Sequence, residues 1–167
     1  QVHNIKTTLA EFYYNNKKYD KAIRYYNDVL VNTRDEWHSK QLFNASWCHF
    51  KKKDYNKAID LIKKAYKYGN HKKYVSLKDQ VLDSIGLFHI FAKRVEEGVD
   101  FYLSNVEKPV QYLVKMAKKT TGEGSFKDTR FILVSALKNA KTKNQVDEQI
   151  MLHLNEMEIY RTFKKYN

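Results

Sequence analysis

The chain has 167 residues, of which 43% are apolar, and with only five glycines and one proline it favours one domain of long helices. The chain contains no run of 18 apolar residues, the length needed to span a membrane. Its single cysteine, Cys48, excludes an internal disulfide. The net charge of +12 is nearly all lysine, a pattern that indicates a solvated surface attractive to acidic partners more than a nucleic-acid site built from arginines.

Apolar residues recur at intervals of three and four along the chain, as amphipathic helices require. The spacing predicts six helices in the first two thirds, at about residues 3–16, 19–32, 38–53, 55–68, 75–93 and 95–105. After Pro109 the spacing continues to about Lys119, and Thr120–Ser125 is the one strong break. Two further helices are predicted at about 126–141 and 143–166.

The first part of the chain repeats itself. The segment Tyr19–Leu30 recurs as Tyr55–Tyr66, so that Ala22 and Ala58 lie 36 residues apart. A helical unit recurring at this period is typical of stacked helical hairpins. A weaker third copy places Gly98 a further 40 residues after Ala58. Because this interval is longer than the usual repeat, the extra residues predict a longer loop at residues 69–74.

The ordered series of small and aromatic residues resembles the tetratricopeptide repeat (TPR) family over about residues 3–105. The resemblance implies close helix contacts at a small residue in each helix, namely Ala10, Ser46 and Gly86 in the first helices and Ala22, Ala58 and Gly98 in the second. Lys17-Lys18 departs from the family's usual Gly-Asp at the turn. We therefore expect an all-α, TPR-like helical-hairpin solenoid of about three repeats at 1–105, with 106–167 as a helical extension or a degenerate further repeat.

The last predicted helix carries two apolar stripes, so we expect it to need two packing partners. One stripe is Val146, Ile150, Leu154, Met157 and Tyr160, and the other is Leu152, Ile159, Phe163 and Tyr166. The preceding hairpin would cover one stripe. A neighbouring chain, a further repeat or a fold-back onto the repeats would cover the other, so an oligomer formed through residues 142–167 is one prediction.

In the family, the first helix of each hairpin lines a concave face that binds other proteins. Laid onto this chain, the resemblance implies nine partner-binding residues, which are Glu11, Tyr14, Lys40, Phe43, Asn44, Trp47, Phe50, Asp83 and Leu87. Phe43, Trp47 and Phe50 are four and three residues apart and therefore share one helix face. Two alternatives stay open: the aromatic residues anchor a helix or an extended peptide, or they are buried between hairpins or beneath residues 126–167.

No arrangement of residues indicates catalysis or a metal. His49 and His89 fall at equivalent places in successive repeats, which packed helices hold about 10 Å apart, too far for one metal whose histidine ligands lie at about 2 Å. Gly122-Glu123-Gly124 lacks the Gly-Lys-Ser/Thr of a phosphate-binding loop, and Ser125 has no adjacent histidine. We predict that the chain is not an enzyme and uses no cofactor.

The sequence therefore predicts a non-catalytic protein–protein interaction scaffold or adaptor that holds a protein or peptide segment, with an acidic partner favoured by the lysine excess. Abundant Lys, Asn and Tyr resemble proteins of AT-rich bacterial genomes, which suggests assembly of a bacterial envelope or flagellar-motor complex. The alternative is a basic helical-repeat module that binds nucleic acid, which the few arginines and the acidic Glu11 and Asp83 disfavour. The compartment stays open between periplasm or envelope and cytoplasm, and because the chain begins at Gln1 rather than Met we expect a processed form or part of a larger protein.

Overall fold

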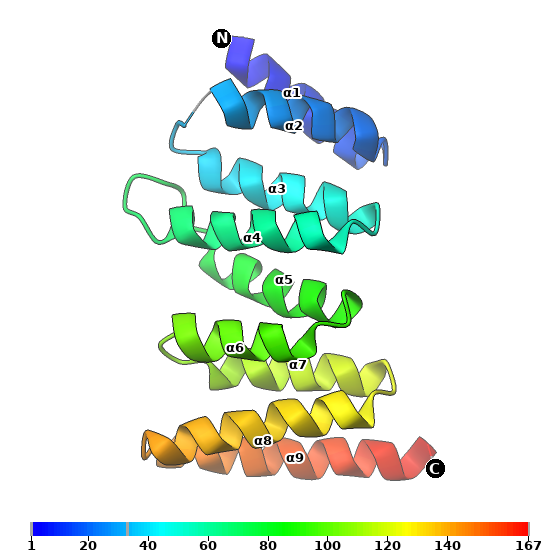
Figure 1. The fold of residues 1–167 in the computed structure, drawn as a ribbon, viewed down its shortest axis with the longest axis vertical. Helices are drawn as coiled ribbons and strands as arrows, with labels where there is room; N and C mark the ends of the chain where they lie inside the picture. Colours follow the sequence, from blue (N-terminus) through cyan, green and yellow to red (C-terminus); the bar gives the residue numbers. More distant parts are fainter. Residues whose placement is uncertain (1, 33, 167) are drawn as a thin grey trace. The chain divides into compact units, whose positions relative to one another are not determined.

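The computed structural model describes residues 2–32 and 34–166, which form nine α-helices and no strand (Figure 1). The helices are α1 (Val2–Asn15), α2 (Tyr19–Asn32), α3 (His38–Lys51), α4 (Tyr55–Gly69), α5 (Lys78–Phe91), α6 (Val95–Asn105), α7 (Val110–Gly122), α8 (Phe126–Thr142) and α9 (Val146–Tyr166). The all-α, helical-repeat class predicted from the apolar spacing is confirmed. Within the described part of the chain, no helix is long and apolar enough to cross a membrane.

The largest differences from the predicted boundaries are three residues each, at the start of α5, the end of α7 and the start of α9, which begins at Val146 rather than near residue 143. Helix α5 begins at Lys78 rather than near residue 75, because residues 70–77 form the connection that the surplus of the third repeat predicted. Helix α7 continues to Gly122, through part of the break predicted at Thr120–Ser125. The hydroxyl groups of Thr120 and Thr121 both donate to the carbonyl oxygen of Ala117, at 2.9 and 2.8 Å, so these residues extend the helix without losing their hydrogen bonds.

Five helix–helix connections share one turn geometry. In each, one residue has a left-handed backbone, and these residues are Lys17, Lys53, Lys93, Gly124 and Asn144, with φ between 53° and 75°. The amide of that residue donates to the carbonyl three residues earlier at 2.9–3.1 Å, and the next amide donates to the carbonyl five residues earlier at 2.8–3.0 Å. This is the Schellman ending of a helix. Lysine therefore occupies, three times, a position that ordinarily favours glycine.

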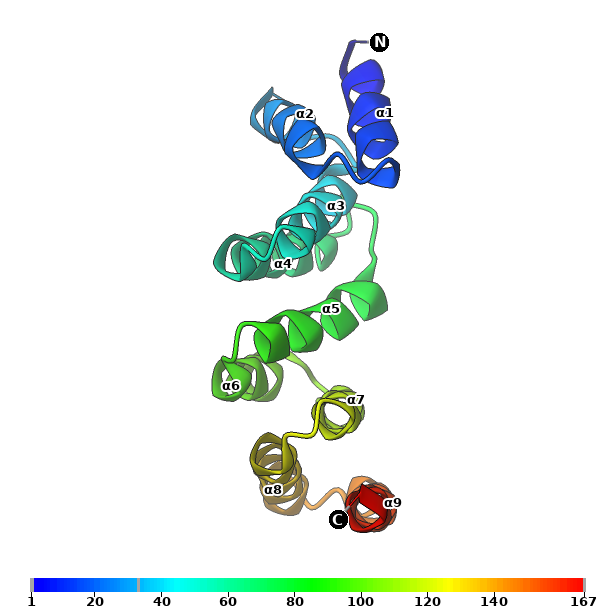
Figure 2. The same cartoon turned by 90° about the vertical axis from the view of Figure 1, so that its right-hand side faces the viewer.

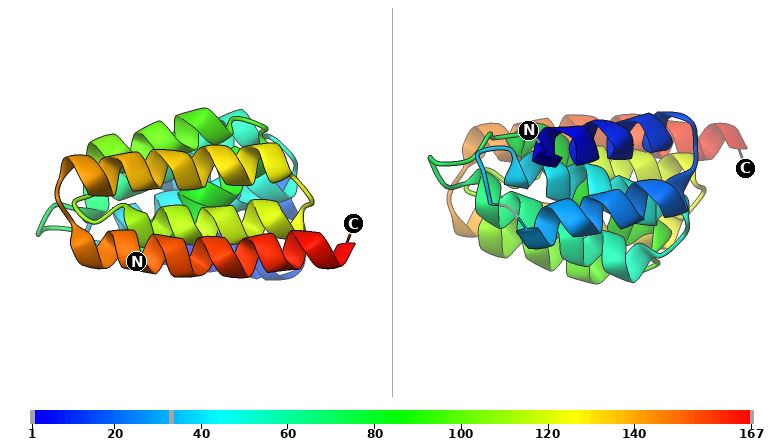
Figure 3. Two further views of the ribbon diagram at one scale, coloured as in Figure 1. Left: turned by 90° about the horizontal axis from the view of Figure 1, so that it is seen from below. Right: turned by 90° about the horizontal axis from the view of Figure 1, so that it is seen from above.

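The chain divides into two compact units, Gln1–Phe88 and His89–Asn167, and the division falls within α5. The first unit contains the antiparallel hairpins α1–α2 and α3–α4, and α2 also packs on α3 (Figure 2). The second unit contains α6, the α7–α8 hairpin and α9, which contacts both α7 and α8 (Figure 3). The division at residue 105 that the repeats predict rests on sequence periodicity and stays a prediction.

Small residues occupy the positions where the repeat pattern expects close helix contacts. Ala10, Ala22, Ala58 and Ser46 have no exposed surface. In the second unit, a methyl group added at Gly98 would lie 2.9 Å from Cβ of His89, closer than side-chain carbons normally approach. The glycine therefore permits the contact between α6 and the end of α5 within this unit.

The two apolar stripes of α9 have different environments. Leu152 and Ile159 are each 3% exposed and pack inside the second unit. Phe163 is half-buried, with its ring centroid 5.0 Å from that of Phe126. All five members of the other stripe, Val146, Ile150, Leu154, Met157 and Tyr160, are exposed. The last helix therefore buries Leu152 and Ile159 and leaves the other stripe at the surface of its unit; the side chain of Tyr166, the last member of the stripe that contains Leu152, lies outside the described residues.

Candidate functional site

A polar cavity of about 190 Å³ lies in the first unit between α1 and the start of α3. Eight residues line it, namely Thr7, Thr8, Glu11, Asp35, Trp37, Lys40, Gln41 and Asn44. The α1 residues are spaced by three and four, as are those of α3, so each helix presents one face to the cavity. Three of the predicted partner-binding residues, Glu11, Lys40 and Asn44, are brought together here.

The rim of this cavity carries an ion pair and a tryptophan. Nζ of Lys40 lies 3.6 Å from Oε1 of Glu11 and 5.5 Å from the centroid of the Trp37 ring. Trp37 is 46% exposed and lies directly before α3, where its amide donates to Oδ1 of Asp35 at 3.0 Å. The cavity therefore offers a cation, a carboxylate and an aromatic ring side by side at a solvent-accessible edge.

Behind the cavity lies the buried phenol of Tyr26, from α2. Tyr26 has no exposed surface, and its hydroxyl faces the side-chain amide of Asn44. Burial raises the pKa of this phenol, the polar contact with the Asn44 side chain lowers it, and the nearby Cys48, Glu11 and Tyr14 raise it further. The buried phenol therefore restrains the Asn44 amide, which itself lines the cavity.

The predicted aromatic stripe of α3 forms a separate cluster with α5. The Phe50 ring stacks on Phe88 at 4.5 Å between centroids, and the Trp47 ring meets Phe88 edge-on at 5.1 Å. Phe43 lies against Trp47 at 6.5 Å. Trp47 and Phe50 therefore pack α3 against α5 within the first unit, and all three aromatic residues of the stripe are half-buried and keep part of their surface accessible.

The remaining predicted residues lie outside the cavity. Tyr14 is half-buried with its ring 5.8 Å from Tyr19, and burial raises its pKa. On α5, Asp83 is exposed and Leu87 is half-buried. Burial also raises the pKa of the Cys48 thiol to about 12, consistent with the packing role expected from its place in α3.

Several residues of the cavity were not predicted from the sequence. Trp37 precedes Lys40 by three residues and Asn44 by seven, so extending the α3 face by one turn would have included it. Gln41 shares that face. Tyr26, which lies beside Asn44, had no such signal, because it belongs to α2, where no partner-binding residue was predicted.

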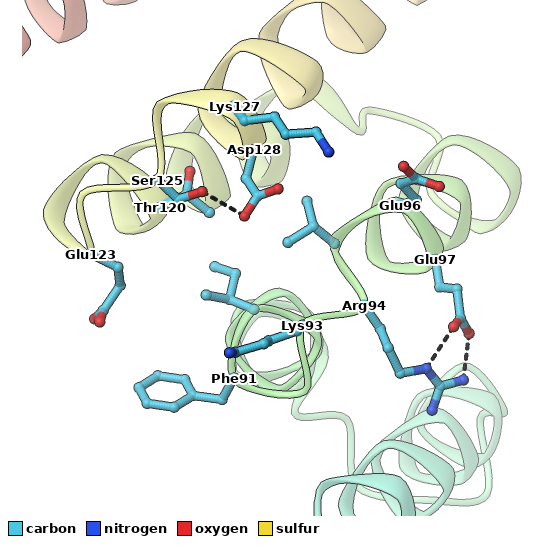
Figure 4. A pocket seen from close by; sticks show the side chains of 12 residues that line it. Phe91, Lys93, Arg94, Glu96, Glu97, Thr120, Glu123, Ser125, Lys127 and Asp128 are labelled. Atoms are coloured by element: carbon cyan, nitrogen blue, oxygen red, sulfur yellow. Dashed lines mark hydrogen bonds and ion pairs between the residues drawn. The ribbon is translucent and has the colours of Figure 1, made fainter.

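A larger cavity of about 640 Å³ lies in the second unit, near the turns that follow α5 and α7 (Figure 4). Its charged lining residues are Lys93, Arg94, Lys127, Glu96, Glu97, Glu123 and Asp128. Three of them already have partners, since Nε of Arg94 donates to Oε1 of Glu97 at 2.6 Å, and Asp128 accepts from Ser125 at 2.6 Å. With both signs of charge interleaved, this cavity selects neither an anion nor a cation.

No group of three His, Cys, Asp or Glu side chains within the described part of the chain could hold a metal ion.

Comparison with known proteins identifies the repeat region. Residues 1–106 match the family described as the RNPP family C-terminal domain, which spans the first unit and continues through α6. The match supports a TPR-like helical repeat and does not extend to the tetratricopeptide family itself. No curated protein matches the chain significantly.

Proposed function

The chain belongs to the RNPP family, whose C-terminal domains are peptide-binding helical repeats with regulatory rather than catalytic roles, and from this premise we propose that the cavity between α1 and α3 is its peptide site. The single observation that carries the proposal is the side-chain amide of Asn44, which is held beside the buried Tyr26 phenol and lines one cavity together with Glu11 and Lys40.

Asn44 is suited to hold a peptide backbone. Its side-chain amide has both a donor and an acceptor group, which match the carbonyl and the N–H of one residue in an extended peptide. Because Asn44 is half-buried and faces Tyr26, its orientation is constrained before a ligand arrives. A preorganised amide loses little entropy on binding.

The rim ion pair is suited to exchange partners. The side chains of Glu11 and Lys40 are each about two fifths exposed, and an exposed pair of this kind contributes at most about 1 kcal/mol. A charged group on a peptide can therefore replace either partner at small cost. The exposed Trp37 ring beside Lys40 would cover an apolar side chain of the same peptide.

The groove centred on Trp47 that the sequence suggested stays a second possible position for the peptide. Its half-buried rings could extend the contact along α3 beyond Asn44. An acidic partner, an oligomer formed through the exposed α9 stripe, and a role in a bacterial envelope or flagellar-motor assembly all stay predictions.

A peptide-library experiment tests the proposal. The whole chain is immobilised, short peptides are selected from a displayed random library, and the dissociation constant of each selected peptide is measured by fluorescence anisotropy. We expect Asn44→Ala to weaken the selected peptides about tenfold or more, because it removes two backbone hydrogen bonds. Asn155→Ala is the matched control, since Asn155 is also a half-buried helical amide but belongs to α9.

Two results would contradict the proposal. One is a selected peptide whose affinity is the same in wild type, Asn44→Ala and Asn155→Ala. The other is failure of the library to yield any binder while a single-stranded oligonucleotide binds with a steep salt dependence, which would support the nucleic-acid alternative.

A further inference from the structure

A second groove in the first unit, on the faces of α2 and α4, has a composition unlike that of the α1–α3 cavity. It encloses about 690 Å³. Its lining combines basic and apolar side chains, namely Asn27, Leu30, Val31, Arg34, His38, Leu42, Lys57, Leu61, Lys64, Lys67, Tyr68, His71, Lys73 and Tyr74. We propose that this groove binds an acidic amphipathic helix of a partner protein, independently of the peptide site proposed above.

The charge of the groove is uncompensated. Its described lining includes five permanent cations and no aspartate or glutamate, and the cations are Arg34, Lys57, Lys64, Lys67 and Lys73. Among the side chains that the structure describes, none of these five forms an ion pair. The acidic residues near these cations in sequence do not line the groove. Asp28 is paired with Lys6, Asp35 lines the α1–α3 cavity, and Glu36 and Asp60 are exposed. An acidic partner would relieve the mutual repulsion of these cations.

The floor of the groove is apolar and has helical spacing. Leu42 and Leu61 are nearly buried, Leu30 is half-buried, and Val31 lies exposed at the edge. On α4 the lining residues Lys57, Leu61, Lys64 and Tyr68 recur at four, three and four, so one face of the helix runs along the groove for roughly 16 Å. That length accommodates about three turns of a second helix. A helix with apolar residues on one face and acidic residues beside them would match floor and rim together.

One end of the groove is built by the surplus residues of the repeat. His71, Lys73 and Tyr74 line it, and the Tyr74 ring lies 5.1 Å from Tyr68 and 6.2 Å from His38. The connection that carries them is tied to the start of the α3 hairpin, because Val75 N donates to the Glu36 carbonyl at 2.8 Å. The Ser39 hydroxyl also donates to the Val75 carbonyl. The longer loop of this repeat therefore closes the groove and adds a cation to it.

A protein helix fits the groove better than a nucleic acid does. Phosphates would neutralise the cations but would leave the leucine floor without an apolar partner. Tyr68 and Tyr74 are half-buried and pack against each other and against His38, so their rings form the end wall of the groove rather than an exposed platform for stacking bases. Only one of the five cations is arginine, the residue that reads phosphate and base edges in pairs of hydrogen bonds.

The test uses two synthetic probes on the whole chain. One is a fluorescein-labelled helix of about four turns, with leucines on one face and glutamates elsewhere; a scrambled peptide of the same composition serves as its control. The other is a labelled single-stranded oligonucleotide of similar charge. The protein variants are Lys64→Glu/Lys67→Glu in the groove and Lys138→Glu/Lys141→Glu on α8. Both pairs are exposed, lie three residues apart on a helix and change the net charge equally.

We expect the amphipathic peptide to bind wild type, the scrambled peptide to bind less, and the groove pair to weaken binding at least about tenfold while the α8 pair changes it by less than about twofold. Circular dichroism of each variant checks that the fold is retained. The proposal is overturned if wild type does not bind the peptide, if both double variants weaken it equally, or if only the oligonucleotide depends on Lys64 and Lys67.

Discussion

The left-handed lysines in the helix turns give a prediction whose size follows from the backbone. Lys17, Lys53 and Lys93 have φ of 58°, 64° and 56°, and all three are exposed, so their side chains are not needed for packing. A residue with a Cβ loses roughly 1–2 kcal/mol in this conformation. Glycine avoids that cost but loses more conformational entropy when the chain folds, which destabilises the folded state by about 0.4–1 kcal/mol. Lys53→Gly should therefore raise the free energy of unfolding by about 0.5–1 kcal/mol.

Urea denaturation followed by circular dichroism measures the effect. Lys53→Ala is the matched control, because it removes the same side chain and keeps the strained backbone; we expect its midpoint to stay close to that of wild type. Gly124 occupies the same position of its turn at φ 75°, with no neighbour within 4 Å of an added Cβ, so Gly124→Ala should destabilise by about 1 kcal/mol. If Lys53→Gly is no more stable than Lys53→Ala, the assigned turn geometry is wrong.

Three further predictions concern single positions. Gly98→Ala should destabilise the protein by about 1 kcal/mol, because overpacking against His89 outweighs the gain in helix propensity. Gly122→Ala should not destabilise it, because the space around that glycine is open. Urea unfolding curves of the two variants and wild type test the difference. Cys48 should resist thiol reagents at pH 8 in the folded protein and react at once in urea, because burial raises its pKa to about 12 from the ordinary thiol value of 9.0. By linkage the same shift lowers stability as pH rises above about 9, where only the unfolded chain loses the proton. Leu154→Glu should leave the free energy of unfolding nearly unchanged, because the side chain is 62% exposed. If the exposed α9 stripe joins two copies of the chain, the same substitution should reduce the mass measured by light scattering. An unchanged oligomeric mass would contradict self-association through this stripe.

The periodicity of the sequence predicts the helices well, since apolar spacing and small residues act locally and repeat. The ends of α2, α6 and α8 lie within a residue of their predicted positions. The C-terminal end of α7 could not be placed, because its threonines satisfy their hydroxyls within the helix instead of ending it. The Lys-Lys turn also forms despite lacking glycine, since backbone hydrogen bonds hold it.

The candidate sites are only partly predictable. Glu11, Lys40 and Asn44 follow from the repeat register, which places them on facing helices. The Tyr26 phenol and the wall formed by Tyr74 depend on which helices and loops meet in space, and no spacing rule contains that information. The two stripes of α9 are a further example: the sequence predicts both apolar stripes, but only the packing of the helices decides which of them is buried.

The position of the peptide site can be measured with the two tryptophans, which both belong to the first unit. Trp37 lies at the rim of the α1–α3 cavity, and Trp47 lies in the aromatic cluster with Phe88. In Trp47→Phe the sole tryptophan is Trp37, and in Trp37→Phe it is Trp47. We predict that a library-selected peptide shifts the emission of Trp37 to shorter wavelength as its ring is covered and leaves that of Trp47 unchanged. A saturable change of Trp47 with none of Trp37 would contradict the proposed site and place the peptide on the aromatic stripe.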